Sequence, residues 1–149
     1  ATRTGFTGIE YFPIDADFRV EGRFEPHLEA TSFEIQTVLG TTERMATPGV
    51  VQFEIAGKPY TIHPVIEEGT ADWFFIFGDR TNGRDTYGAG RFVYAAPAVD
   101  GKVTLDFNRA YNPPCAFTAY STCPLPPPEN RLDLRVTAGE RKYRGSGSD

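Results

Sequence analysis

Hydrophobic and polar residues alternate with a period of two along three short stretches of the chain. Phe18–Phe24 places apolar residues or glycine at every second position and charged residues between them. Phe33–Leu39 and Leu132–Ala138 alternate in a similar way, although in Phe33–Leu39 Thr37 stands among the apolar positions and Val38 among the polar ones. Because successive side chains of a β-strand point to opposite faces, each stretch predicts a strand with one buried face.

Other apolar stretches are bounded by turn residues. Val51–Ala56 and Tyr60–Val65 flank Gly57-Lys58-Pro59, and this arrangement predicts a hairpin. Trp73–Phe77 is apolar throughout, as expected of a short strand that is buried on both faces. Thr47-Pro48-Gly49 predicts a turn, because proline fixes φ and glycine adopts positive φ without strain.

Two further strands are expected in the second half of the chain. Thr86–Tyr94 is predicted as a strand in which Gly88 and Gly90 mark a bulge or a close approach of the backbone. Val103–Phe107 is expected to pair with it across the turn at Asp100-Gly101.

The pattern as a whole predicts about eight or nine short strands and no helix longer than about two turns. The predicted fold class is therefore all-β, a small antiparallel β-barrel or sandwich with one long loop rich in proline and cysteine. A barrel fits the meander slightly better. Residues 1–144 are expected to form a single β-barrel-like domain, and residues 145–149 a flexible tail.

Asp106–Leu132 is the long loop, and it lies between two predicted strands. Loops of this length are uncommon inside compact domains and are often functional. It contains both cysteines and six of the 12 prolines, namely Pro113, Pro114, Pro124, Pro126, Pro127 and Pro128.

Composition narrows the classes of function. A chain of 149 residues with 13% aromatic residues and 15 glycines suits one all-β domain with tight turns. The net charge of −5 argues against nucleic-acid binding, and no apolar run reaches the ~18 residues that a membrane span needs. His27 and His63 do not have the spacing of a zinc site, so neither a metal nor a cofactor is expected.

Four segments carry a resemblance to a known family. They are Gly8–Val20, Gly78–Phe92, the loop Asp106–Leu132 with its specific motifs NPPCAF and CPLPPPENRL, and Ala138–Tyr143. In these segments the chain resembles the domain-of-unknown-function family 1684 over nearly its whole folded length. The resemblance implies a soluble, cytoplasmic, prokaryotic protein and assigns no activity. Many members carry further residues upstream of this lead-in, so one face is a candidate interface for such a segment or for a second copy.

Cys115 and Cys123 leave three alternatives open. A disulfide between them would add about 2–3 kcal/mol of stability. An intracellular compartment would instead keep both thiols reduced, and they would pack as small hydrophobic groups. A nucleophilic Cys115 is the third alternative, although no histidine lies near it in the sequence to act as a base.

Polar and aromatic residues gather where the predicted strands meet the long loop. At a barrel mouth, arginines of such a group would bind a carboxylate or phosphate, and tyrosines would form the walls of a pocket. The alternative is that these residues satisfy backbone groups of the loop itself. The candidate ligand-binding residues are Tyr87, Arg91, Asp106, Asn108, Arg109, Tyr111 and Asn112.

The predicted function is a binding module for a small polar or anionic ligand at this barrel mouth. One alternative is an enzyme that uses the same pocket, such as a hydrolase with an aspartate (Asp79 or Asp106) or a tyrosine in acid–base work. Another is a structural or interaction domain that docks an N-terminal segment or forms a homodimer.

Overall fold

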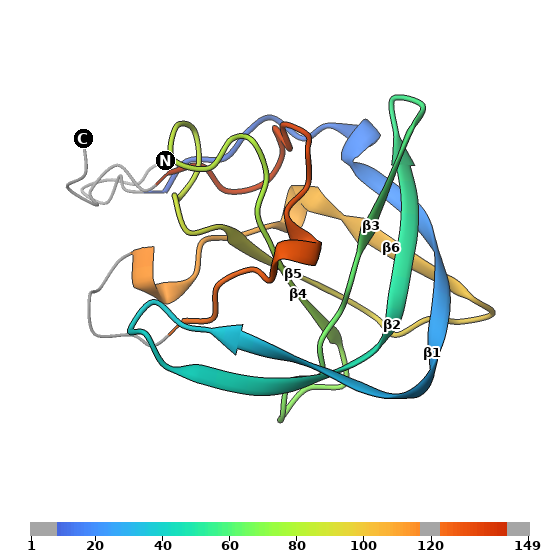
Figure 1. The fold of residues 1–149 in the computed structure, drawn as a ribbon. Coiled ribbons are helices and arrows are strands. Elements are labelled where there is room, and N and C mark those ends of the chain that lie inside the picture. Colours follow the sequence, from blue (N-terminus) through green and yellow to red (C-terminus); the bar gives the residue numbers. More distant parts are fainter. Residues whose placement is uncertain (1–8, 117–122, 143–149) are drawn as a thin grey trace.

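Two antiparallel sheets form the framework of the chain (Figure 1). The structure is a computed structural model that describes residues 9–116 and 123–142. Its strands are β1 (Arg19–Gln36), β2 (Thr42–Ile55), β3 (Lys58–Ile62), β4 (Trp73–Phe77), β5 (Arg91–Ala95) and β6 (Lys102–Asp106). The predicted all-β class is confirmed, although the described residues form fewer strands than expected.

Helical structure in the described ranges is confined to short 3-10 turns. They are η1 (Ala16–Phe18), η2 (Phe107–Arg109), η3 (Pro114–Ala116) and η4 (Pro128–Asn130). No helix in this part of the chain has the length and apolar character needed to cross a membrane.

The larger sheet has the strand order β3-β2-β1-β6 and curls into a half-barrel (Figure 1). The sequence predicts two separate strands at Phe18–Phe24 and Phe33–Leu39, whereas the structure joins most of both in the single strand β1. The pairing of β1 with β2 shifts register between Pro26 and Thr31. Because a bulge of this kind bends a strand and increases its twist, the shift accounts for the curl of the sheet.

The turn predicted at Thr47-Pro48-Gly49 is wrong, because these residues lie inside β2 and opposite that register shift. Glycine is needed here for close packing. A Cβ atom on Gly49 would lie within 2.2 Å of the carbonyl oxygen of Glu25. The hairpin between β2 and β3 is confirmed, with Ala56 and Gly57 at positive φ in its turn.

The smaller sheet pairs β4 with β5, so the predicted pairing of Thr86–Tyr94 with Val103–Phe107 is wrong. The strand β6 pairs with β1 instead. β5 begins only at Arg91, because Gly90 turns the chain with a φ of 105°. A Cβ atom on Gly90 would lie 2.7 Å from the carbonyl oxygen of Phe77, which confirms a close approach of the backbone at this glycine.

Leu132–Ala138 is predicted as a strand but is irregular in the structure. Its predicted alternation nevertheless holds, since Leu132, Val136 and Ala138 are buried and the charged residues between them are exposed. The segment is attached through single contacts, such as the 2.8 Å hydrogen bond that the Leu132 N–H donates to the Gly78 carbonyl.

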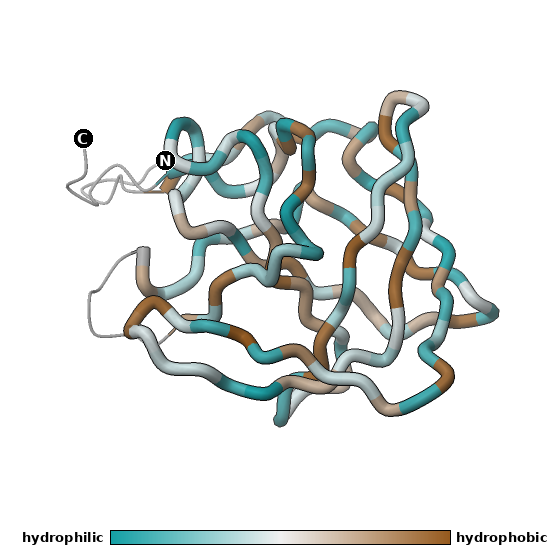
Figure 2. The backbone as a smooth tube through the Cα atoms, viewed as in Figure 1, coloured by the Kyte–Doolittle hydropathy of each residue, from teal (hydrophilic) through white to brown (hydrophobic). Residues whose placement is uncertain are grey.

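The strands β4 and β5 separate two hydrophobic clusters. Alternate residues, among them Phe75 and Val93, join the larger core together with apolar residues of β2, β3 and β6. The residues between them, among them Phe74 and Phe92, enter a smaller cluster with Cys123. Each buried phenylalanine contributes about 1.5–3 kcal/mol. Figure 2 shows hydrophobic positions along these strands, whereas the loops at the top of the view mix hydrophilic and hydrophobic positions.

The long loop between β6 and the C-terminal segment is confirmed in its described parts. Cys115 and Cys123 form a disulfide with a Cα–Cα distance of 6.1 Å. Of the three alternatives left open by the sequence, the structure therefore shows the disulfide. Asn130 fixes the far end of the loop, because its side chain donates hydrogen bonds to the carbonyls of His63 and Ile76.

Candidate functional site

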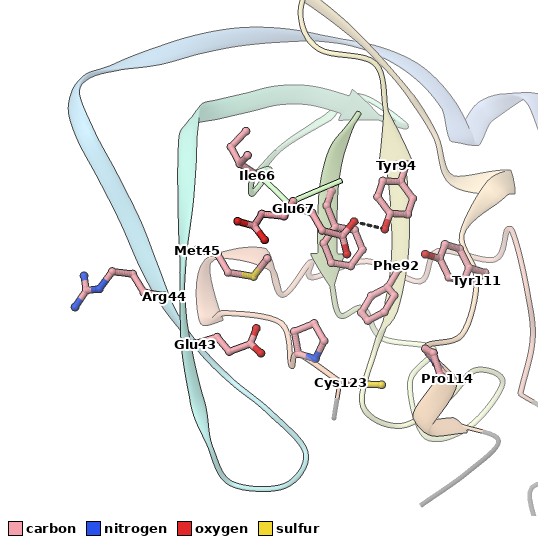
Figure 3. A pocket seen from close by; sticks show the side chains of 13 residues that line it. Glu43, Arg44, Met45, Ile66, Glu67, Phe92, Tyr94, Tyr111, Pro114 and Cys123 are labelled. Atoms are coloured by element: carbon pink, nitrogen blue, oxygen red, sulfur yellow. Dashed lines mark hydrogen bonds between the residues drawn. The ribbon is translucent and has the colours of Figure 1, made fainter. Parts of the chain in front are cut away.

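A pocket of about 1030 Å³ opens beside the smaller sheet (Figure 3). Its floor consists of aromatic side chains from β4, β5 and the start of the long loop. Its rim carries glutamates from the start of β2 and from the segment before β4. Met45 and the disulfide-bonded Cys123 complete the apolar part of the lining.

The register of the strands builds the aromatic floor. Phe74 and Tyr94 are direct partners across β4 and β5, and the centroids of their rings lie 4.8 Å apart. Tyr111 forms an isolated bridge with Phe92, and its ring centroid lies 5.7 Å from that of Phe92 and 6.3 Å from that of Tyr94. Aromatic pairs at such distances attract one another, so the four rings form one continuous apolar surface.

Tyr94 links this floor to the acidic rim. Its hydroxyl donates a 2.5 Å hydrogen bond to Oε1 of Glu67, which fixes both side chains (Figure 3). Burial raises the pKa of Tyr94 far above its usual value, and the hydrogen bond to Glu67 raises it further. Burial also raises the pKa of Tyr111. Both phenols therefore keep their protons at neutral pH.

The rim is negatively charged. Glu43, Glu67 and Glu68 line the pocket, and among the described residues of its lining Arg44 is the only cationic one. The guanidinium of Arg44 forms a 2.9 Å ion pair with Glu34 outside the pocket. Figure 3 shows this guanidinium directed away from the aromatic rings. The carboxylates therefore make the pocket electrostatically negative.

Of the seven residues predicted for the site, Tyr111 lines this pocket and the other six lie elsewhere. Asp106 and Arg109 line a separate hollow of about 330 Å³ together with Arg19. The hydroxyl of Tyr87 donates a 3.4 Å hydrogen bond to the carbonyl of Cys115. The structure thus distributes the predicted residues over several separate places in the molecule.

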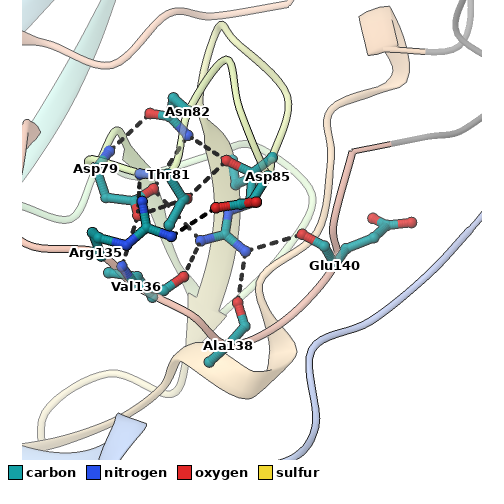
Figure 4. A network of polar contacts seen from close by, with 10 residues as sticks. Asp79, Thr81, Asn82, Asp85, Arg135, Val136, Ala138 and Glu140 are labelled. Carbon is teal, nitrogen blue, oxygen red and sulfur yellow. Dashed lines mark hydrogen bonds and ion pairs between the residues drawn. The ribbon is translucent and has the colours of Figure 1, made fainter. Parts of the chain in front are cut away.

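Arg91, predicted to bind an anionic ligand, lies on the opposite face of β5 and is fully buried. Its partners Val136, Ala138 and Glu140 are labelled in the polar network of Figure 4. Its terminal nitrogens donate hydrogen bonds of 2.6–3.0 Å to the backbone carbonyls of Val136, Ala138 and Glu140. The carboxylate of Asp79 lies 3.5 Å from the guanidinium, and neither side chain is exposed. Burial lowers the pKa of Arg91, and Asp79 opposes this shift. The residue holds the C-terminal segment and is not accessible to a ligand.

Asn108 and Asn112 also hold backbone. Asn108 exchanges two hydrogen bonds of 2.9 Å with the backbone of Asp15, which attaches the lead-in to the loop. The side chain of Asn112 donates to the carbonyl of Arg141, and its backbone N–H donates to the carboxylate of Glu140. These contacts agree with the alternative that polar residues of the loop satisfy backbone groups.

Sequence reasoning missed most of the pocket, including Glu67, Phe74 and Tyr94. A signal was present in β5. Its period of two places Arg91 on one face and Tyr94 on the other, so the two side chains do not belong to one site. The contact between Glu67 and Tyr94 joins residues that are 27 positions apart, and no local pattern announces it.

Comparisons with known proteins agree with the fold. A family model described as "Protein of unknown function (DUF1684)" matches residues 4–141 of the chain. The chain is also similar to an uncharacterised protein of Haloarcula marismortui whose structure was determined by NMR in solution. The two share 35% sequence identity over 91% of this chain and 77% of that chain, with a TM-score of 0.74. No curated protein matches the chain.

Proposed function

The chain belongs to the DUF1684 protein family, and we propose that this member is a binding module that holds a small organic molecule in the pocket over Phe74, Phe92, Tyr94 and Tyr111. The observation that carries the proposal is the continuous aromatic floor beneath a concave opening. Small-molecule pockets typically combine volumes of about 300–1,000 Å³, apolar walls and a few polar groups that fix orientation. The hydrogen bond between Tyr94 and Glu67 supplies such a polar group in a fixed geometry.

Two features of the structure argue against an anionic ligand held by Arg91 and against a cysteine nucleophile at the pocket. The arginine expected to bind an anion, Arg91, is buried against backbone carbonyls. Cys123, which lines the pocket, is held in a disulfide and is not a thiolate nucleophile.

An enzyme remains the second candidate, because Glu67 and Tyr94 form one coupled carboxylate–phenol pair at the pocket. In that case Glu67 would act as the base, since the raised pKa of Tyr94 keeps the phenol protonated. Turnover of a bound compound that disappears in Glu67→Gln would support this candidate.

The proposal includes the cytoplasmic location that the family resemblance implies. Thiols are mostly reduced in that compartment, so the disulfide between Cys115 and Cys123 would then face a reducing environment. The structure of the pocket wall that contains Cys123 would accordingly depend on whether this disulfide is oxidised or reduced.

The test is an NMR screen of the protein with a library of small neutral and charged fragments. We expect hits to shift signals of Tyr94 and Tyr111, and we expect Met45→Trp, which fills the pocket, to weaken them by about tenfold or more. Val99→Trp is the matched control, because Val99 is 70% exposed and does not line the pocket. Hits that persist in Met45→Trp, or a library without hits at this pocket, would contradict the proposal.

A further inference from the structure

We infer that the ligand of this pocket is an organic cation, with an ammonium group joined to a compact apolar body. The inference rests on the proposed function, because it names the chemical class that the same pocket selects. It follows from the combination of an aromatic floor with an acidic rim.

The negative charge of the acidic rim is not neutralised by ion pairs with described residues. Within the described part of the chain, none of Glu43, Glu67 and Glu68 takes part in an ion pair. The cation that the described residues contribute to the lining, Arg44, is paired with Glu34 and also donates a 3.1 Å hydrogen bond to Ser32. A cationic ligand would therefore meet three carboxylates, whereas an anionic ligand would meet repulsion from all of them.

Glu67 is the best-placed partner for an ammonium group. It is only partly exposed, and Tyr94 holds its carboxylate in position through Oε1. Glu67 lines the pocket, and within the described residues its other oxygen, Oε2, accepts no hydrogen bond from the protein, so this oxygen can accept one from a ligand. A carboxylate that is already ordered loses little conformational freedom when it binds a cation.

The aromatic floor suits the apolar body of such a ligand. Phe74, Phe92, Tyr94 and Tyr111 offer hydrophobic contact, and aromatic rings also attract cations through their electron-rich faces. None of these four side chains carries a positive charge that would repel an ammonium group. Floor and rim thus favour the same class of molecule by independent interactions.

An anionic ligand finds no comparable site among the described residues. Arg91 is buried on the other face of β5. Arg19 and Arg109 line the smaller hollow of about 330 Å³, where the carboxylate of Asp106 lies 3.9 Å from Arg19. The pocket therefore has an excess of carboxylates, whereas the smaller hollow has an excess of guanidinium groups. Ligands that differ only in charge can test this assignment.

The experiment compares compounds of equal shape and different charge by NMR titration at neutral pH and low salt. One set is choline, 3,3-dimethylbutan-1-ol and 3,3-dimethylbutanoate, and a second is 2-phenylethylamine, 2-phenylethanol and phenylacetate. In at least one set, we expect the cation to bind this pocket about tenfold or more tightly than the neutral compound, and the anion to bind more weakly still.

Glu67→Gln keeps an oxygen that accepts the hydrogen bond of Tyr94 and removes the charge. We expect it to reduce the preference for the cation to about threefold or less, while Glu54→Gln, an exposed residue of β2 outside this pocket, leaves the preference unchanged. Equal binding of cation and neutral compound in both sets would overturn the inference and leave the binding function standing. Failure of all six compounds, together with a fragment screen without hits at the pocket, would overturn both.

Discussion

Arg91 and Tyr94 lie three positions apart on β5 and face opposite sides of the strand, and their polar groups meet opposite surroundings. The guanidinium of Arg91 is fully buried, and both of its terminal nitrogens are directed at backbone carbonyls of the C-terminal segment. The hydroxyl of Tyr94 makes one hydrogen bond to Glu67, at the edge of an open pocket. One strand thus serves a structural network on one face and a candidate binding site on the other.

The difference shows how to tell a structural polar group from a functional one in a chain of this kind. In the network around Arg91, charged groups are matched within the protein. Asp79 accepts hydrogen bonds from the backbone and hydroxyl of Thr81 and from the backbone of Val136. In the pocket, carboxylates remain that have no cationic partner in the described part of the chain. Function is better sought where the charges are unmatched and the surface is concave.

The largest expected effect breaks the buried network. Arg91→Met removes the donors of three carbonyls and leaves the carboxylate of Asp79 buried without its partner. Breaking a buried ion pair in this way costs about 3–5 kcal/mol. Urea unfolding followed by circular dichroism measures the loss.

The matched control for this variant is Arg44→Met on the pocket side. The ion pair of Arg44 with Glu34 is exposed, with 68% and 65% of the two side chains accessible, so its loss is expected to cost less than about 1 kcal/mol. If the two variants unfolded at the same urea concentration, the contrast between the buried network around Arg91 and the exposed ion pair beside the pocket would be lost.

The second-largest expected effect is the loss of stability when the disulfide beside the pocket is removed. A cross-link that closes a loop of this size contributes about 2–3 kcal/mol. We therefore expect unfolding in the presence of dithiothreitol, or of the double variant Cys115→Ala and Cys123→Ala, to show a stability lower by that amount. NMR shifts on reduction should centre on the pocket residue Tyr111 and spare the backbone of Val136 in the network. Equal stability with and without the cross-link would contradict the prediction.

Periodicity alone was sufficient for much of the fold. The alternation in β1 predicts which residues face inward, and it is reproduced by buried Gly22 and Ile35 between exposed polar or charged neighbours. The pattern does not name strand partners, so it cannot decide that β6 pairs with β1 rather than with β5. A turn motif such as Thr47-Pro48-Gly49 is equally compatible with a strand that bends at a bulge.

The site was less predictable, for a physical reason. An arginine beside a glycine at a strand end is the same sequence signal whether the side chain meets a ligand or, like Arg91, three carbonyls. The long loop correctly marked a place of dense polar contacts. It marked only the part of the pocket that Tyr111 and Cys123 line. The rest was missed because Glu67, Phe74 and Tyr94 lie outside the loop and meet only through tertiary structure.

The smallest expected effect is a pH dependence on the structural face. Burial raises the pKa of Glu140, while the N–H of Asn112 and the charge of Arg91 oppose this shift. Because the folded state then holds this proton more tightly than the unfolded state, the group's contribution to stability is present below its unfolded pKa, about 4.5, and is lost as the pH rises through the folded pKa.

Glu140→Gln removes the titration of this carboxyl group and keeps an oxygen that accepts the hydrogen bond from the N–H of Asn112. Wild type should therefore lose stability relative to Glu140→Gln as the pH rises from about 4 toward 7, as measured by urea unfolding at each pH. The same difference should persist at high salt, because salt screens buried charges less than exposed ones. If wild type instead gained stability relative to Glu140→Gln as the pH rises, the fold would favour ionised Glu140. Arg91 would then compensate the charge of Glu140, whereas the carboxylates of the pocket have no such cationic partner in the described part of the chain.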